Sequence, residues 1–273
     1  MSIDIKNFVI RTLVASIGIP VIVTCIYYGH IVFSVMMIVI SVLCVYEYFT
    51  MIRKYHIHKN ISMIMAVLFS VLLNYNKFNI NKNILLYTML MMLILFSIEI
   101  FNGVVTSSIV RISLSFFGIF FIPMTLMHLV YIRTLPHGME ITFFIIIVTW
   151  IVDTAAYIIG SLFGIHKLTQ NISPRKTLEG SIVGCILGVL ISILFRTLLM
   201  QQILTMSMTL ILGCTISIIG QFSDLAESMI KRDSGIKDSS CLIPGHGGVF
   251  DRFDSYIFVA PTVYYILSLC YKL

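Results

Sequence analysis

Runs of about 20 mostly apolar residues recur along the chain, and they restrict its fold more than any other feature. A run of that length matches a helix that crosses the hydrocarbon core of a bilayer. Only 11% of the 273 residues are charged and 59% are hydrophobic, whereas a soluble domain carries about 25% charged residues. The sequence therefore predicts an all-α polytopic integral membrane protein embedded in the lipid bilayer.

We expect about nine transmembrane helices, of which the third is short and could be tilted, interfacial or absent. The predicted ranges are 9–28, 31–51, 61–75, 83–101, 108–132, 141–163, 180–200, 204–230 and 254–271. Lys6 and Arg11 precede the first range as in a signal peptide, but no small-x-small cleavage site follows. The first range is therefore interpreted as a membrane helix that is retained.

The basic residues predict an orientation. With the N-terminus in the cytoplasm, the cytoplasmic connections hold the larger set: Arg53, Lys54, Lys59, Lys167, Arg175, Lys176, Lys231, Arg232, Lys237 and Arg252. The outward connections hold Lys77, Lys82 and Arg133. Because cytoplasmic loops are enriched in lysine and arginine, both polar loops are expected to face the cytoplasm. We attribute the net charge of +6 to these basic loops and to the binding of anionic phosphate ligands. No nucleic-acid partner is expected. The compact length and lack of a transit peptide suggest a bacterial inner membrane.

Acidic residues concentrate in the second half of the chain. Before Trp150 they are Asp4, Glu47, Glu99 and Glu140, whereas eight follow it. We therefore expect residues 1–140 to form a lipid-facing scaffold and residues 141–273 to form the catalytic region. The six cysteines are scattered and form no CxxC pair, so neither a disulfide framework nor a zinc site is expected.

A first polar cluster runs from Asp153 to Gly180. Asp153, Tyr157, Gly160 and Gly164 share one face of the sixth predicted helix, and the small residues would let another helix approach closely. Ser173 and Pro174 are typical of a helix N-cap and first position. With Arg175 and Lys176 beside it, that helix end would attract phosphate. The alternative is a capped helix with a topogenic basic loop.

A second cluster ends the eighth predicted helix. One stripe of this helix carries polar residues at spacings of three and four: Asp224, then Glu227 or Ser228, and then Lys231. The alternative interpretation is an intrahelical salt bridge between Glu227 and Lys231. A purely structural ion-pair role is less expected for Asp224 than for Glu227, because Asp224 lies deeper in the apolar run.

A third cluster spans Pro244 to Asp254. Gly247 and Gly248 allow unusual dihedrals and close approach to a ligand, and their amides can bind an anion. Neither a Walker loop nor a GxGxxG dinucleotide fingerprint is present. Asp251 and Asp254 can face one site with Asp224, and such hard oxygen ligands favour magnesium.

The other side chains of the third cluster suit phosphate binding. Arg252 can hold a phosphate through two hydrogen bonds. His246 is interpreted as a hydrogen-bonding loop residue in preference to a metal ligand. The chemistry points to phosphoryl or nucleotidyl transfer at a membrane face, and it leaves the nucleotide and the lipid open.

These residues closely resemble the phosphatidate cytidylyltransferase family, also called CDP-diacylglycerol synthases. The family signature S-x-x-K-R-x4-K-D, then P-x-H-G-G-x-x-D-R-x-D, is matched between residues 228 and 255 by Ser228, Lys231, Arg232, Lys237, Asp238, Pro244, His246, Gly247, Gly248, Asp251, Arg252 and Asp254. The run from Asp153 to Gly180 is similar to a second family block. Together the two blocks cover most of residues 150–260.

The resemblance implies that CTP and phosphatidic acid react to give CDP-diacylglycerol and pyrophosphate. It implies magnesium held by Asp224 and Asp251, a second cation such as K⁺, and support of that shell by Asp254. Lys231, Arg232 and Arg252 would neutralise the triphosphate or the leaving pyrophosphate. Substrate binding would also involve Ser173, Arg175, Lys176, Thr177, Lys237, His246, Gly247 and Gly248. A homodimer is the family expectation.

Two other functions were weighed against this one. A transporter would use intramembrane acids such as Asp153, Glu47 and Glu99 as an ion path, but it predicts acids along several spans and an inverted repeat, and neither is evident. A CDP-alcohol phosphotransferase would carry a D-G-x2-A-R motif, which the chain lacks. The prediction is therefore a magnesium-dependent nucleotidyltransferase.

Overall fold

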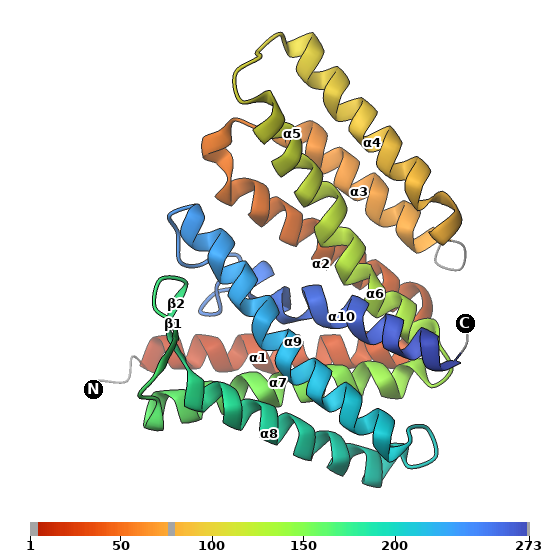
Figure 1. The fold of residues 1–273 in the computed structure, drawn as a ribbon, viewed down its shortest axis with the longest axis vertical. Helices are drawn as coiled ribbons and strands as arrows, with labels where there is room; N and C mark the ends of the chain where they lie inside the picture. Colours follow the sequence, from red (N-terminus) through yellow and green to blue (C-terminus); the bar gives the residue numbers. More distant parts are fainter. Residues whose placement is uncertain (1–4, 76–79, 272–273) are drawn as a thin grey trace.

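Helices that pack side by side make up nearly all of the computed structural model, which describes residues 5–75 and 80–271 (Figure 1). In chain order they are α1 (Ile5–Tyr28), α2 (His30–Met51), η1 (Arg53–Tyr55), α3 (Lys59–Tyr75), α4 (Ile80–Asn102), α5 (Ser108–Phe116), η2 (Phe117–Phe121), α6 (Ile122–Thr134), α7 (Gly138–Phe163), α8 (Leu178–Phe195), η3 (Arg196–Met200), α9 (Met206–Asp233) and α10 (Phe250–Tyr271). The strands β1 (Lys167–Thr169) and β2 (Ser173–Thr177) form an antiparallel hairpin between α7 and α8. The predicted all-α class is confirmed, with this small hairpin as an addition.

Among the described residues, eight helical segments are long and apolar enough to cross a membrane. They are Val9–Tyr28, His30–Met51, Asn83–Asn102, Ser108–Thr134, Gly138–Phe163, Leu178–Met200, Met206–Asp233 and Phe250–Cys270. Each overlaps one predicted range, and the remaining range coincides with the shorter helix α3, Lys59–Tyr75. A multi-pass membrane protein is therefore confirmed, while a ninth span stays a prediction. Lys77, used in the charge argument, lies outside the described residues.

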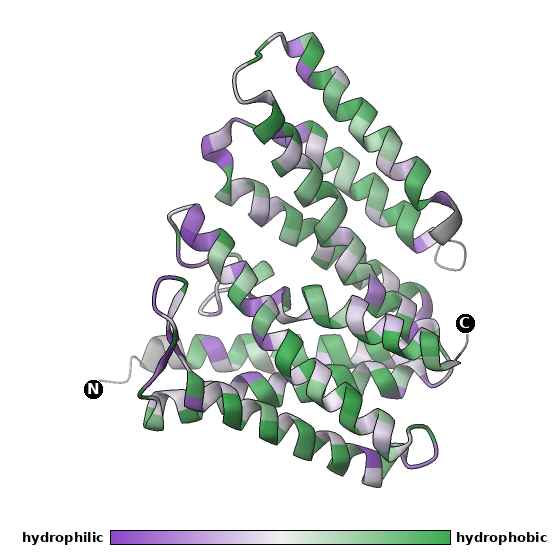
Figure 2. Ribbon diagram, in the orientation of Figure 1, coloured by the Kyte–Doolittle hydropathy of each residue, from purple (hydrophilic) through white to green (hydrophobic). Residues whose placement is uncertain are grey.

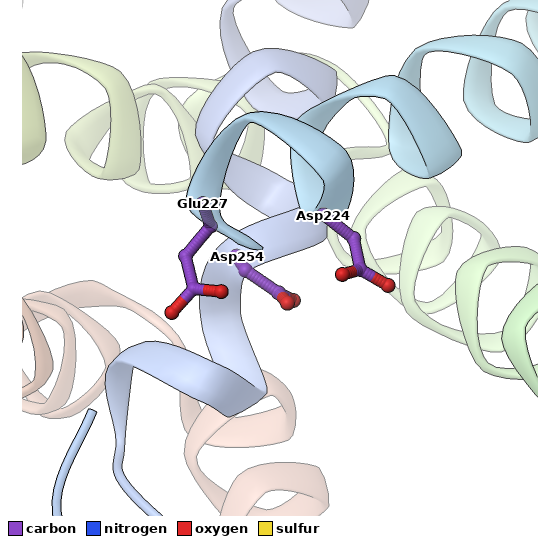
Figure 3. Close-up of side chains that lie close together, drawn as sticks. All are labelled: Asp224, Glu227 and Asp254. Carbon is purple, nitrogen blue, oxygen red and sulfur yellow. The ribbon is translucent and has the colours of Figure 1, made fainter. Parts of the chain in front are cut away.

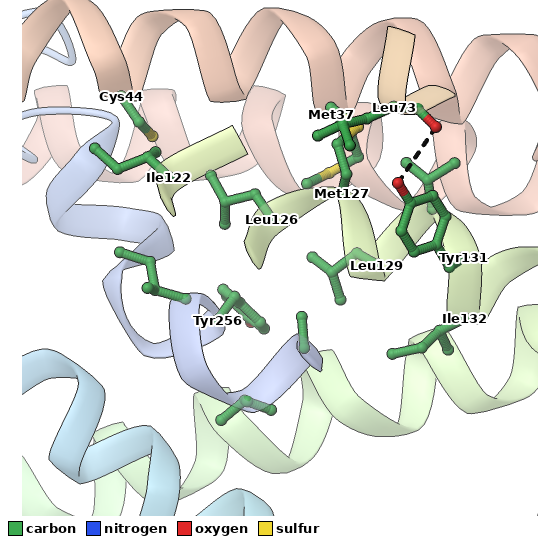
Figure 4. Packing of buried hydrophobic residues seen from close by; sticks show 14 of the residues in the cluster. Met37, Cys44, Leu73, Ile122, Leu126, Met127, Leu129, Tyr131, Ile132 and Tyr256 are labelled. Atoms are coloured by element: carbon green, nitrogen blue, oxygen red, sulfur yellow. Dashed lines mark hydrogen bonds between the residues drawn. The ribbon is translucent and has the colours of Figure 1, made fainter. Parts of the chain in front are cut away.

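The core that positions the site is centred on α6. Its residues Ile122, Leu126 and Leu129 are buried between α2 and α10 (Figure 4). Tyr131, also on α6, donates a hydrogen bond to the backbone oxygen of Leu73 at 3.3 Å. Helix α6 is buried on nearly all sides, and it packs against α2, α3 and α10, so it joins the N-terminal helices to α10.

Small residues bring α7 and α8 together, as predicted. A β-carbon built on Gly180 would lie 2.5 Å from the backbone oxygen of Ala156 and 3.0 Å from the Cα of Gly160. That spacing leaves no room for a side chain at Gly180. Tyr157, by contrast, is 73% exposed, so the predicted face does not belong wholly to this interface.

The prediction that Ser173 caps a helix is wrong. Ser173 pairs with Thr169 in the hairpin, and α8 begins five residues later at Leu178. Thr177 is the N-cap, and its Oγ1 accepts a hydrogen bond from the amide of Gly180 at 3.3 Å. Strand pairing satisfies the backbone ahead of Thr177, and Pro174 is tolerated because each strand of this two-stranded sheet is an edge strand.

Hydrophilic residues gather at one end of the molecule. Figure 2 shows them on the hairpin and on the C-terminal end of α9, while the long helices are mainly hydrophobic. The chain leaves α9 at Asp233 and enters α10 at Phe250 on this side. The two polar segments expected to form the site therefore lie at the same end of the bundle.

Candidate active site

Three carboxylates from two helices converge at this polar end. Asp224 and Glu227 are one turn apart on α9, and Asp254 lies in the second turn of α10 (Figure 3). Residues three apart share a helix face, and α9 packs along α10. The contact is close, because Ser223 Oγ donates a hydrogen bond to the backbone oxygen of Asp254. One oxygen from each carboxylate lies within 4.8 Å of the other two. We call Asp224, Glu227 and Asp254 the acidic triad.

Two lysines contact carboxylates in and beside the triad. Lys176 of β2 places its Nζ 2.6 Å from Asp224 Oδ2. Lys231 Nζ lies between Glu227 Oε2 at 2.6 Å and Asp251 Oδ1 at 2.7 Å. The predicted ion pair between Glu227 and Lys231 is thus confirmed, although Glu227 also belongs to the triad. The three triad carboxylates and Asp251 outnumber the two lysines, so this group of side chains has an excess of negative charge.

The triad fits a hard divalent cation. Glu227 is 1% exposed; its Oε2 lies 2.6 Å from Lys231 Nζ, and its Oε1 has no hydrogen-bond partner among the described residues. Buried polar atoms are rarely left in that state. The ligand atoms are all carboxylate oxygens, which magnesium prefers over nitrogen or sulfur. Asp224 and Asp254 were expected to face one site, and the structure adds Glu227 to them.

Asp251 lies beside the triad, where it is surrounded by donors. It accepts hydrogen bonds from Lys231 Nζ at 2.7 Å, the Gly248 amide at 2.8 Å and the Ser239 amide at 3.1 Å, and Ser239 Oγ lies 3.0 Å from its Oδ2. The Gly248 amide, which was expected to bind an anion, therefore binds the Asp251 carboxylate. Gly247 has a φ of +84°, and a β-carbon there would lie 2.8 Å from Asp251 Oδ2. A metal-ligand role for Asp251 stays a prediction.

Two cavities border the triad. One of about 180 Å³ lies against the hairpin and is lined by Arg175, Lys176, Thr177, Asp153 and Asp224, among others. The other, of about 390 Å³, has Asp153, Asp251, Arg252 and Asp254 at its polar end and apolar walls from α1, α2, α6 and α7. Asp153 lines both. The acids therefore lie between a smaller cavity, which carries two basic and two acidic side chains, and a larger cavity that is mainly apolar.

The remaining predicted residues lie around this centre. Arg232 donates to the backbone oxygens of Ile172 and Ile236, at 3.1 and 2.9 Å, which ties the hairpin to the end of α9. Arg252 is exposed, and its Nε donates to the His246 oxygen at 3.0 Å. His246 has a buried Nδ1 without a hydrogen-bond partner among the described residues. Lys237 is exposed, and Ser173 is held in the strand pair, so neither contacts the triad.

Two acidic residues matter more than the sequence suggested. Glu227 was interpreted through its ion pair, although it lies three residues from Asp224 on the same stripe. Glu47 was placed in the scaffold, yet it is fully buried and contacts the segment that precedes α10. A carboxylate inside an apolar run requires a polar partner, and that signal could have identified Glu47.

Comparison with known proteins identifies the family of the chain. Proteins named phosphatidate cytidylyltransferase match about half of the chain: one from Staphylococcus saprophyticus is 40% identical over 135 residues (50% of this chain, 52% of the relative). One from Bacillus subtilis is 37% identical over 150 residues (55% of each), and one from Synechocystis is 42% identical over 134 residues (49% and 45%). The chain thus spans about half the length of the curated relatives it matches. The model of the cytidylyltransferase family matches residues 9–270, so the chain belongs to that family.

Proposed function

We propose that the protein is a phosphatidate cytidylyltransferase, which transfers CMP from CTP to phosphatidic acid and releases pyrophosphate. The observation that carries this proposal is the acidic triad with Lys176 and Lys231, placed between a small polar cavity and a larger, mainly apolar one. The small cavity holds Arg175 and Lys176, which can bind phosphates once a cation occupies the triad, and the other has the apolar walls to accept lipid chains. The names of the relatives support the same substrates.

The reaction requires positioning and charge neutralisation more than proton transfer. A phosphate oxygen of phosphatidic acid attacks the α-phosphorus of CTP, the bond from that phosphorus to the bridging oxygen breaks, and pyrophosphate leaves with the electron pair. The attacking phosphate is already an anion near neutral pH, so no general base is needed. In phosphoryl transfer the protein acts mainly through orientation and electrostatics.

Each group of residues has a part in that reaction. Asp224, Glu227 and Asp254 would hold magnesium, which when bound neutralises and orients the triphosphate. Ligation by Asp251, the original expectation, would require its carboxylate to exchange Lys231 for the ion. A second cation such as K⁺ is also proposed from the family resemblance.

The cations outside the triad would bind the phosphates. Lys176 and Arg175 line the smaller cavity, where they would bind phosphate with the hairpin residues Ser173 and Thr177. Arg252 borders the larger cavity and would contact the lipid phosphate near His246. Exposed Arg232 and Lys237 would bind the pyrophosphate as it leaves.

The membrane orientation and assembly belong to the same proposal. CTP is a cytoplasmic nucleotide, and the basic connections expected in the cytoplasm lie at the end of the bundle that carries the triad. We therefore propose that the active site faces the cytoplasm of a bacterial inner membrane, and that the protein forms a homodimer as the resemblance implies.

The test is a lipid-product assay. Purified protein with labelled CTP, phosphatidic acid and magnesium should produce a nucleotide lipid that partitions into chloroform. Asp251→Asn should abolish the product without changing membrane insertion, because Asp251 organises Lys231 and the loop before α10. Asp233→Asn is the matched control, since exposed Asp233 accepts only a 3.5 Å contact from Tyr55 through its carboxylate. Wild-type protein that forms no such lipid would refute the proposal.

The alternatives make different predictions in the same assay. Another membrane phosphoryl or nucleotidyl transferase would prefer a nucleotide other than CTP or a different lipid acceptor. An ion-coupled transporter has less support, because Glu99 is paired with Arg111 through hydrogen bonds of 2.5–3.1 Å and is not left open to an ion path.

A further inference from the structure

Glu47 on α2 is a buried carboxylate that binds the segment entering α10. It is 0% exposed, and no cation among the described residues forms an ion pair with it. Its oxygens accept four hydrogen bonds: from Ser239 Oγ at 2.9 Å, Ser240 Oγ at 2.5 Å, and the amides of Val249 at 2.9 Å and Phe250 at 2.7 Å. All four donors belong to the loop between α9 and α10 or to the first residue of α10.

Two of those donors are the amides at the start of α10. The first amides of a helix have no partner within the helix, and a negative charge there is favoured by the helix dipole. Glu47 therefore acts as an N-terminal cap that comes from a helix about 200 residues earlier in the chain. Asp251 and Asp254 follow within the first turn and a half of α10, so their positions depend on how that end is held.

A chain of contacts continues from Glu47 to the triad. Ser239 Oγ lies 2.9 Å from Glu47 Oε2 and 3.0 Å from Asp251 Oδ2. Asp251 binds Lys231 Nζ at 2.7 Å, and the same Nζ lies 2.6 Å from Glu227. The contacts therefore connect α2 to α9 without a gap.

The close approach of Glu47 also explains the second glycine of the loop. A β-carbon on Gly248 would lie 2.5 Å from Glu47 Oε2 and closer still to Ser239 Oγ. Only glycine leaves room for the carboxylate at this point. The backbone at residues 248–250 is thus shaped to receive Glu47, in addition to Asp251.

We infer that Glu47 is a positioning residue for the transfer reaction: it holds the start of α10 and, through Ser239, the Asp251–Lys231 pair in the geometry that the triad requires. This inference rests on the proposed function for its kinetic consequences. Glu47 lines neither of the two cavities beside the triad. Its contribution is to bring a catalytic segment from the second half of the chain against the N-terminal helices.

Glu47→Gln is the test, because it keeps the shape of the side chain. The side-chain NH2 of glutamine would take the place of one carboxylate oxygen and would face the backbone N–H of Val249 or Phe250. Two hydrogen-bond donors would then face each other. Since a misplacement of about 1 Å can cost on the order of 100-fold in rate, we expect kcat per folded molecule to fall about 10–100-fold. The amides of residues 239–253 should also exchange faster with deuterium.

Glu99→Gln is the matched control. Glu99 is a buried glutamate outside the triad, on the N-terminal helix α4, at 8% exposure, and it is paired with Arg111. After correction for folded fraction, this variant should keep kcat within about threefold of wild type and leave exchange at 239–253 unchanged.

A double-variant comparison separates positioning from general stability. Ser239→Ala removes the hydroxyl that Glu47 and Asp251 share, so its effect on kcat should not multiply with that of Glu47→Gln. The inference would be overturned if the effects of the two substitutions on kcat multiply in the double variant. It would also be overturned if Glu47→Gln keeps the wild-type kcat and the wild-type hydrogen exchange. If Glu47→Gln does not fold, Ser240→Ala removes one donor to Glu47 at a half-buried site, and wild-type kcat together with wild-type exchange in that variant would also overturn it.

The inference and the proposed function fail in distinguishable ways. If wild-type protein makes no nucleotide lipid, the proposed function fails, and hydrogen exchange still tests the role of Glu47. Faster exchange at 239–253 in Glu47→Gln but not in Glu99→Gln supports the positioning role. Equal exchange in both variants contradicts it.

Discussion

Replacing Glu227 with glutamine tests whether the triad binds magnesium. The ligand atoms lie within 4.8 Å of one another, and two unit charges at that spacing repel by about 3.5 kcal/mol at an effective dielectric constant of about 20. The substitution relieves repulsion from Asp224 and Asp254 but loses the attraction to Lys231, which retains Asp251. These effects oppose each other, so the stability of the metal-free protein should change little.

The magnesium-bound protein should respond much more strongly. Loss of an outer-shell partner typically weakens metal binding about 10–100-fold, and loss of a direct ligand should cost at least as much. A ligand stabilises the native state by RT ln(1 + [L]/Kd), which is about 2.7 kcal/mol at 100 times Kd and about 0.4 kcal/mol at Kd. At a magnesium concentration 100 times the wild-type Kd, a variant weakened about 100-fold thus loses about 2.3 kcal/mol of stabilisation.

Thermal unfolding in detergent at increasing magnesium concentration measures this difference. The wild-type protein and Glu99→Gln should gain melting temperature with magnesium, and Glu227→Gln should gain little at the same concentrations. Asp251→Asn should keep the magnesium response while losing activity, because Asp251 binds Lys231 instead of completing the triad. A full response in Glu227→Gln together with its loss in Asp251→Asn would refute our reasoning and assign the metal to Asp251.

Two further predictions concern helix packing and the hairpin cation. Gly180→Ala should destabilise the protein by about 1–3 kcal/mol because its β-carbon would meet the Ala156 oxygen, whereas Gly18→Ala, with no neighbour within 4 Å, should not; equal melting temperatures for the two would contradict the close packing of α7 and α8. Lys176→Met should raise the KM for CTP or phosphatidic acid about 10-fold, because a lost charge-assisted contact is worth about 1.5–3 kcal/mol, and the KM that rises identifies the phosphate it binds. Exposed Lys167→Met is its control, and an unchanged KM for both substrates would exclude Lys176 from substrate binding.

The sequence by itself determined the helices and the end of the bundle that carries the chemistry. Apolar runs of about 20 residues specify membrane helices because an unpaired backbone group in lipid is costly, and every predicted range corresponds to a helix. The charged stretches around 167–179 and 228–255 lie between the apolar runs or at their ends. Local spacing also placed Asp224, Glu227 and Lys231 on one face of α9.

A local signal was misleading at the start of α8. The cap was predicted at Ser173 because proline follows it, and Thr177, the N-cap in the structure, was not predicted as one. The hairpin decides for Thr177, since the pairing of β1 with β2 and the bonds from Ile165 and His166 to Glu179 keep residues 173–177 extended. Those contacts depend on the chain before Ser173 folding back on residues 173–179, so no helix-capping rule could reveal them.

Only the tertiary structure decided which carboxylates meet. Helical periodicity specifies the face on which a side chain lies, but not the rotation or crossing of two packed helices. The packing of α9 on α10 selects Asp254 to join Asp224 and Glu227, while the loop amides and Lys231 draw Asp251 aside. Glu47 meets its partners across 192–203 residues of chain. Such a contact depends on how α2 packs beside α6 and α10, and the interior geometry that creates it is not encoded in any local stretch.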